Sequence, residues 1–293
     1  MNRPINNILR EITPLSQGDC LLVFDRVKNK FDFPVHFHPE YELNFIQHAS
    51  NAERIIGDHK SLIGEYELVL VGSNIYHGWK NGSCKSTQIH EITIQFHSDL
   101  IHEGLLARNM MKPIKDMLVN SSTGILFSLD ITKQIAPRLQ ELSRKNGMEA
   151  FIELISVLHL LSISENQTML CQGPMTANDF ANNDQIKKAF EYIEQNYQEK
   201  IMVNDVAQFL NMTETTLSRL LKKRTGKSFV DFLNEYRIGF ASRWLTETDQ
   251  TIAEVAVRCG FYNISNFNRI FRKNKGCTPG QYRENFSGVK RVS

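Results

Sequence analysis

The chain has 293 residues, of which 41% are hydrophobic and 23% are charged, with a formal net charge of +2. This composition is ordinary for a globular protein, and the length favours two domains at roughly 100–200 residues per domain. No stretch of about 18 apolar residues is present and the first residues lack an apolar signal segment, which excludes a transmembrane helix and predicts no export.

The charges and the histidines are distributed unevenly along the chain. Residues 184–293 hold 18 Lys and Arg against 12 Asp and Glu, a net charge of +6, whereas the rest has a net charge of −4. All 9 histidines lie in that remainder. The split indicates two domains, of which the basic one faces nucleic acid. The 5 cysteines are scattered and never form CxxC, which argues against disulfides or a zinc finger and predicts a cytoplasmic protein.

The first third of the chain is predicted to form strands. Segments rich in Val, Ile, Phe and Tyr cover residues 20–27, 41–47, 66–72 and 90–96, with turn-forming GDH, GSN and NGS between them. Many short strands without long helices predict a small β-barrel or sandwich.

The pattern becomes helical after residue 99. Apolar residues recur at steps of three and four in ITKQIAPRLQEL (131–142) and in MEAFIELISVLHLLSIS (148–164). The second stripe is broad, so it forms either core or a surface that pairs with a second copy of the chain. The polar stretch that follows contains Gly-Pro and shows no period, which predicts an interdomain linker.

The C-terminal region contains an internal repeat. Residues 203–228 align with 252–278, so that Arg219 matches Arg269 and Gly226 matches Gly276. Each copy reads as a short helix, a tight turn and a second amphipathic helix, which is the spacing of a helix-turn-helix. Residues 228–248 predict one connecting helix of roughly 30 Å, close to the ~34 Å between successive major-groove turns on one face of DNA.

Local signals place the ends of these helices. Thr251 and Glu254 predict a capping box, Thr213 predicts a cap for the helix that holds Arg219, and Thr278 before Pro279 predicts a further helix start. Gly226 is predicted to end the helix of Arg219.

The second helix of each copy has an apolar face and a polar face. Hydroxyls, amides and basic groups of the polar face are the groups that read base edges or hold phosphates. The predicted DNA-binding residues are Thr215, Thr216, Ser218, Arg219, Lys222 and Lys223 in the first copy and Ser265, Asn266, Asn268, Arg269, Arg272 and Lys273 in the second.

This region resembles the AraC/XylS family of bacterial transcription regulators. The resemblance rests on AQFLNMTETTLSRLLKKRTGKSF, YRIGFASRWL and IAEVAVRCGFYNISNFNRIFRKNKGCTPGQYR, and covers about 100 residues. It implies two helix-turn-helix units that are joined by a helix and enter adjacent major grooves of double-stranded DNA, with RNA polymerase as a further possible partner.

HFHPEYELNF (36–45) raises a separate question about the first half. In a strand, alternate residues share a face, so His36, His38, Glu42 and Asn44 point one way, and His77 could approach from a second strand. Three imidazoles and one carboxylate suit Fe, Mn, Ni or Zn. A polar ligand would also satisfy such a polar inner face, and a barrel that binds nothing is a third reading.

The first half also resembles the cupin-type sensor domain of that family, in HFHPEYEL, IGEYELVLVG and HGW. The resemblance implies a small effector, often a sugar or related metabolite, and dimerisation through the following helices. We therefore favour an effector pocket without a metal. Its predicted residues are His36, His38, Glu42, Asn44, His77 and Trp79.

Together these predictions describe an α+β protein of two domains. Residues 1–163 form a cupin-like β-barrel with dimerisation helices, 164–183 form a linker, and 184–293 form an all-α domain with two helix-turn-helix units. The predicted function is a sequence-specific transcription regulator that is not an enzyme, has no cofactor or metal, and forms a homodimer. The alternative is a metal-dependent cupin enzyme or sensor fused to a DNA-binding domain.

Overall fold

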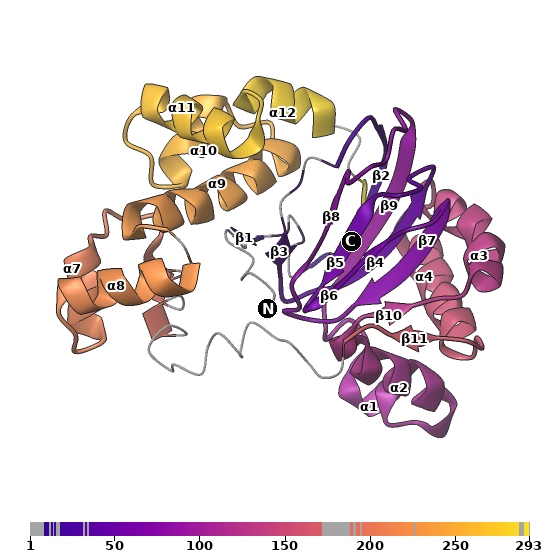
Figure 1. Ribbon diagram of the computed structural model, residues 1–293. Coiled ribbons are helices and arrows are strands. Elements are labelled where there is room, and N and C mark those ends of the chain that lie inside the picture. The colour runs from indigo at the N-terminus through magenta and orange to yellow at the C-terminus, as the bar shows by residue number, and fades with distance from the viewer. Residues whose placement is uncertain are drawn as a thin grey trace. The chain divides into compact units, whose positions relative to one another are not determined.

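The computed structural model divides the chain into two compact units (Figure 1). The N-terminal unit comprises Leu15–Ala177 with Val289–Ser293, and the C-terminal unit comprises Asn178–Gly288 with Met1–Pro14. The structure describes residues 9–11, 13, 15, 18–31, 33, 35–171, 188–189, 192–193, 195–225, 227–286 and 290–292. A two-residue strand, β1 (Leu9–Arg10), comes first in the chain.

A seven-stranded sheet forms the larger layer of the N-terminal unit. Its order is β11-β10-β7-β4-β9-β2-β12, and the pairs are antiparallel. The strands are β2 (Leu21–Lys28), β4 (Tyr41–Gln47), β7 (Tyr66–Val71), β9 (Ile89–Phe96), β10 (Ile125–Leu126), β11 (Thr168–Met169) and β12 (Lys290–Val292). All four strands predicted from composition are therefore confirmed, and they form the centre of this sheet.

A smaller sheet packs against one face of the larger one. It contains β3 (His36–Phe37), β8 (His77–Lys80), β5 (Glu53–Ile56) and β6 (His59–Leu62), paired in that order. Ile56, Ile75 and Trp79 meet Ile46 and Val71 of the larger sheet in a common apolar cluster. The predicted strand-rich domain is confirmed, but the described strands lie in two separate sheets rather than in one closed barrel.

Helices cover the opposite face of the larger sheet (Figure 1). α2 (Lys112–Asn120), α3 (Leu129–Leu142) and α4 (Gly147–Ser162) pack on it, preceded by α1 (Glu103–Leu106) and the 3₁₀ turns η1 (Asn109–Met111) and η2 (Ser121–Thr123). Their core residues meet Leu43 and Phe45 of β4, whereas Ile46 belongs to the cluster between the sheets. The period of two along β4 therefore separates a helix-facing side from a side that faces the second sheet.

Residues 203–286 of the C-terminal unit form a bundle of helices. They contain α7 (Val203–Phe209), α8 (Glu214–Thr225), α9 (Phe229–Glu247), α10 (Ile252–Arg258), α11 (Ile264–Lys275) and α12 (Pro279–Phe286). The predicted caps are confirmed: the hydroxyl of Thr213 accepts from the backbone N–H of Thr216, Thr251 and Glu254 form a capping box, and the hydroxyl of Thr278 accepts from the N–H of Gln281. Gly226 lies outside the described residues.

The connecting helix α9 takes part in two separate cores. Its first half supplies Phe232 and Tyr236 to the cluster with α7 and α8, and its second half supplies Ala241 and Leu245 to the cluster with α10 and α11. With 19 residues at ~1.5 Å each, it is about 28 Å long. α9 therefore packs against the helices of both helix-turn-helix units, as the repeat predicted.

Part of the predicted linker belongs to the N-terminal unit. β11 pairs with β10, and Leu170 and Cys171 are buried in the cluster between the sheets. Residues 172–183 lie outside the described residues. Within the described part of the chain, no helix has the length and apolar character needed to cross a membrane.

Candidate DNA-binding surface and buried ligand site

The polar face of α8 is exposed above a buried apolar face. Leu217 and Leu221 are fully buried in the core of the first helix-turn-helix unit. The predicted residues Thr215, Thr216, Ser218, Arg219 and Lys222 are exposed, whereas the side chain of Lys223 lies outside the described residues. The helix thus offers hydroxyl donors and basic groups to a partner on one side only.

α11 repeats this arrangement. Phe267, Ile270 and Phe271 are buried in the core of the second unit. All six predicted residues are exposed: Ser265, Asn266, Asn268, Arg269, Arg272 and Lys273. The guanidinium of Arg269 donates to the side-chain oxygen of Asn266 at 2.9 Å, which restrains both groups on the exposed face before any ligand is bound.

A buried joint connects the two helix-turn-helix units. Arg237, near the middle of α9, donates from Nε to the carbonyl of Tyr197 at 2.8 Å and from Nη2 to the carbonyl of Glu199 at 2.7 Å. Gly260, in the turn between α10 and α11, lies against the same segment, because a β-carbon there would stand 2.7 Å from the carbonyl oxygen of Tyr197. The joint therefore ties the segment before α7 to the turn of the second unit.

Four of the predicted effector residues meet between the two sheets of the N-terminal unit. His36 and His77 are paired neighbours on β3 and β8 of the smaller sheet, Glu42 lies on β4 of the larger sheet, and His38 lies in the connection between β3 and β4. All four are at most 6% exposed. Each offers one possible ligand atom, and these atoms lie within 4.8 Å of one another.

Glu42 is the centre of this cluster. Its Oε2 lies 3.1 Å from Nε2 of His38 and accepts from Nε2 of Gln95 at 3.0 Å, while its Oε1 accepts from the amide of Asn44 at 3.2 Å. Nε2 of His77 lies 3.6 Å from Glu42 Oε2. The two amides therefore fix the orientation of a carboxylate that faces the histidines.

The protonation of the cluster follows from its surroundings. Burial opposes the charge on Glu42, but His77 and His38 outweigh it and hold the pKa of Glu42 well below its usual value. Burial and the neighbouring His36 lower the pKa of His77, although Glu42 acts the other way. At neutral pH the site accordingly contains an ionised carboxylate beside a neutral imidazole of His77.

Trp79, the sixth predicted effector residue, hydrogen-bonds a different buried carboxylate, that of Glu67. Its indole N–H donates to Oε1 of Glu67 at 2.8 Å, and Oε2 of Glu67 accepts from Arg54 at 2.5 Å. Arg54 also donates to the hydroxyl of Ser61 at 2.8 Å. This network links β5, β6 and β8 to β7 of the larger sheet, and the ring of Trp79 lies 6.4 Å from that of His77.

Sequence reasoning missed Gln95 and Thr93, which complete the polar wall beside Glu42 and Asn44. The amide of Asn44 donates to the hydroxyl of Thr93 at 3.1 Å. The signal was present in HEITIQF, where Glu91, Thr93 and Gln95 alternate with apolar residues, since such alternation predicts a polar face.

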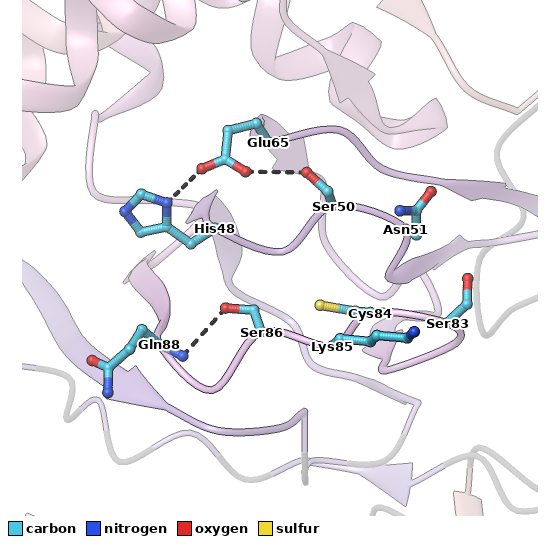
Figure 2. Close-up of a pocket in the computed structure, with 9 residues that line it drawn as sticks. All are labelled: His48, Ser50, Asn51, Glu65, Ser83, Cys84, Lys85, Ser86 and Gln88. Atoms are coloured by element: carbon cyan, nitrogen blue, oxygen red, sulfur yellow. Dashed lines mark hydrogen bonds and ion pairs between the residues drawn. The ribbon is translucent and has the colours of Figure 1, made fainter.

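A separate, open hollow of about 740 Å³ lies on the N-terminal unit (Figure 2). In it Glu65 accepts from Ser50 at 3.1 Å and pairs with His48. The lining residues are His48, Ser50, Asn51, Glu65, Ser83, Cys84, Lys85, Ser86 and Gln88. None of the predicted effector residues is among them, so the hollow and the buried cluster are different sites.

Comparison with known proteins defines the class of the C-terminal unit. Residues 206–285 match the family model described as a helix-turn-helix domain. The matched range covers α8, α9, α10 and α11, and so includes the exposed basic faces of α8 and α11. The C-terminal unit therefore contains a helix-turn-helix domain, as the repeated motif predicted.

Two bacterial relatives support this class. The chain is 30% identical over 149 residues to an uncharacterized HTH-type transcriptional regulator, SAS0078, of Staphylococcus aureus, which covers 50% of this chain and 18% of that protein. It is 34% identical over 92 residues to the uncharacterized HTH-type transcriptional regulator YtdP of Bacillus subtilis, covering 31% of this chain and 12% of that protein. The chain thus spans less than a fifth of the length of these relatives.

A solved structure resembles nearly the whole fold. ToxT from Vibrio cholerae matches with a TM-score of 0.53 at 15% sequence identity, over 92% of this chain and 99% of that one. At this identity the likeness concerns the fold alone: a strand-rich unit followed by a helix-turn-helix unit.

Proposed function

We propose that this chain is a bacterial transcription regulator that binds double-stranded DNA through α8 and α11 and senses a small molecule with its N-terminal unit. The observation that carries the proposal is the repeat: two helices at matching positions each present basic, hydroxyl or amide side chains above a buried apolar face. Such groups donate to phosphates and to base edges in the major groove. The α9 core contacts give the two helices a rigid connection.

In this proposal the N-terminal unit is a sensor rather than an enzyme. A polar ligand such as a sugar or related metabolite contacts the His36–Glu42–His77 cluster, which is buried and would enclose it. Binding favours one arrangement of the DNA-binding units over another, and so shifts the population that meets the operator and RNA polymerase. No disulfide joins the five cysteines, which supports a reducing, cytoplasmic location.

Arg219→Ala and Arg269→Ala should each weaken binding to the cognate DNA site by about 1–3 kcal/mol if the arginine contacts a base. Both side chains are exposed on the faces described above. The measurement is fluorescence anisotropy with a labelled operator. Lys222→Ala and Lys273→Ala should instead flatten the dependence of affinity on salt concentration, because phosphate contacts release counterions.

Lys115→Ala is the matched control for these variants, because Lys115 is an exposed basic residue on α2 of the N-terminal unit. It should leave both the affinity and its salt dependence unchanged. Wild-type affinity in both arginine variants would show that these arginines do not contact the DNA. An equal loss of affinity in Lys115→Ala would show that the effect comes from the net charge of the protein and not from a specific contact.

The proposal also includes dimerisation through α4. Ala150, Leu154 and Leu161 are buried on one side of this helix. On the opposite side, Met148 and Ile152 are 69% and 60% exposed. Residues four apart share a helix face, so the exposed pair forms an apolar stripe that a second copy of the chain could cover.

Ile152→Glu should convert the dimer to monomer without unfolding it, because it places a charge in the centre of the proposed apolar contact. Sedimentation velocity gives the readout. Val119→Glu is the control, since Val119 is 63% exposed on α2 and lies outside the stripe. If Ile152→Glu is still a dimer, the dimer contact does not involve this stripe of α4.

A further inference from the structure

The buried cluster has the size of a metal coordination site. The possible ligand atoms of His36, His38, Glu42 and His77 lie within 4.8 Å of one another. Around a metal ion with bonds of about 2.0–2.2 Å, two ligand atoms on opposite sides are about 4.0–4.4 Å apart. Bringing all four atoms onto one ion would therefore take a contraction of a few tenths of an ångström if the most distant pair stands on opposite sides of it, and of about 1 Å if the four ligands are tetrahedral.

His77 is held in the tautomer that a metal requires. Its Nδ1 lies 2.8 Å from the carbonyl oxygen of Ile75, which can only accept, so the proton is on Nδ1 and Nε2 carries a lone pair. Among the described residues, Nε2 has no hydrogen-bond partner, and the side chain is only 1% exposed. A ligating histidine whose other nitrogen donates to a backbone carbonyl is a recurring arrangement in metal sites.

Hydrogen bonds also hold the carboxylate of Glu42 in a fixed orientation. The amides of Asn44 and Gln95 hold Glu42 at 3.2 and 3.0 Å, and the rings of His36 and His38 lie 4.2 and 4.9 Å from that of His77. Three imidazoles and one carboxylate suit Mn, Fe, Co, Ni or Zn, whereas Mg and Ca prefer oxygen ligands alone.

We infer that His36, His38, Glu42 and His77 bind one divalent first-row transition-metal ion. This inference rests on the proposed sensor role of the N-terminal unit, and names a metal ion in place of a sugar as the species that these four side chains bind. Because His36 and His77 belong to the smaller sheet and Glu42 to the larger one, the ion would join the two sheets. The sequence analysis favoured a metal-free pocket and gave a metal-dependent cupin as the alternative.

The test uses the full-length protein, stripped with a chelator and titrated with Zn²⁺ in competition with a chromogenic chelator. The wild type should bind one Zn²⁺ per chain and gain thermal stability from it, while Mg²⁺ should have no effect. Glu42→Gln and His77→Gln should bind at least about 100-fold more weakly, because loss of an outer partner alone costs 10–100-fold. Glu42→Gln keeps the shape of the side chain and is not expected to disturb folding. Weak Zn²⁺ binding by this variant therefore tests the site even if His77→Gln misfolds.

His48→Gln is the matched control, because His48 pairs with Glu65 on the surface and represents adventitious histidine–carboxylate binding. It should retain wild-type affinity. Absent stoichiometric Zn²⁺ binding in the wild type, or equal binding in Glu42→Gln and His77→Gln, would overturn the inference. Operator binding is measured in parallel with and without Zn²⁺: no binding in either state together with intact Zn²⁺ binding contradicts the proposed function alone, and operator binding without stoichiometric Zn²⁺ binding contradicts the metal site alone.

Discussion

Replacing Arg54 by methionine should destabilise the N-terminal unit by about 3–5 kcal/mol. Arg54 is 3% exposed and donates at 2.5 Å to Glu67, which is 4% exposed. Without the guanidinium, the carboxylate of Glu67 would remain buried and would keep a hydrogen bond from the indole N–H of Trp79. An uncompensated buried charge is among the most costly changes that a single substitution can make. Chemical unfolding followed by circular dichroism measures the loss.

Two further variants separate the buried charge from a general loss of packing. Arg54→Met combined with Glu67→Gln should recover most of the stability, because glutamine is neutral and still accepts from Trp79. Lys60→Met should cost less than about 1 kcal/mol, since Lys60 is exposed and pairs with the half-buried Glu53 on the neighbouring strand. If the double variant is no more stable than Arg54→Met, lost packing rather than the charge of Glu67 explains the effect.

The dependence on pH provides an independent check of the same prediction. Burial raises the pKa of Glu67 in the folded protein, although Arg54 and Trp79 act in the opposite direction. A carboxyl group whose folded pKa is raised costs stability above that pKa, and the cost disappears as pH falls through it towards the ordinary value of 4.5. Removal of Arg54 raises the folded pKa further. The deficit of Arg54→Met relative to the wild type should therefore be largest at neutral pH and smaller near pH 5.

Gly260→Ala should destabilise the C-terminal unit by at least about 2 kcal/mol more than Gly276→Ala. Both glycines have positive φ, 77° and 74°, so alanine is strained at both positions. At Gly276 a β-carbon would meet nothing within 4 Å, whereas at Gly260 it would lie 2.7 and 2.8 Å from two backbone oxygens. The difference between the two variants therefore isolates the steric contact from the backbone strain, and thermal unfolding measures it.

The steric contact created by Gly260→Ala should also weaken DNA binding. Gly260 touches the segment whose carbonyls accept from Arg237, so a displaced turn disturbs the joint between the two helix-turn-helix units. At temperatures where it remains folded, Gly260→Ala should bind the operator more weakly than Gly276→Ala. Equal stability and equal affinity of the two variants would show that the joint tolerates the extra carbon.

Much of the fold could be predicted because its signals are local. Leu217 and Leu221 recur at helical spacing, and Phe267 and Phe271 repeat them one unit later, so period and repeat together indicated two helix-turn-helix units before any contact was known. The caps at Thr213, Thr251 and Thr278 are equally local, because each joins groups three residues apart. The short strands β5 and β6 were not predicted, since four residues carry too little periodic signal.

The candidate site was only partly predictable. The alternation in HFHPEYELNF placed Glu42 and Asn44 on one face, and the structure shows these two side chains hydrogen-bonded there. It could not place Gln95, which is 53 residues from Glu42 in the chain and reaches it through the pairing of β4 with β9. Trp79 was predicted to contact a ligand, but its indole N–H is taken by Glu67.

The sequence by itself therefore determined the class of elements, the duplicated DNA-binding motif and the faces that it exposes, because all of these depend on residues within one helix or one strand. Only the tertiary structure decided which polar groups share the interior: that three histidines meet one carboxylate, that Arg54 neutralises Glu67, and that Gly260 abuts the carbonyl of Tyr197. These contacts join residues far apart in the chain, and their geometry is set by strand register, by the facing of the two sheets and by the packing around α9. No periodicity in a linear sequence encodes those quantities directly.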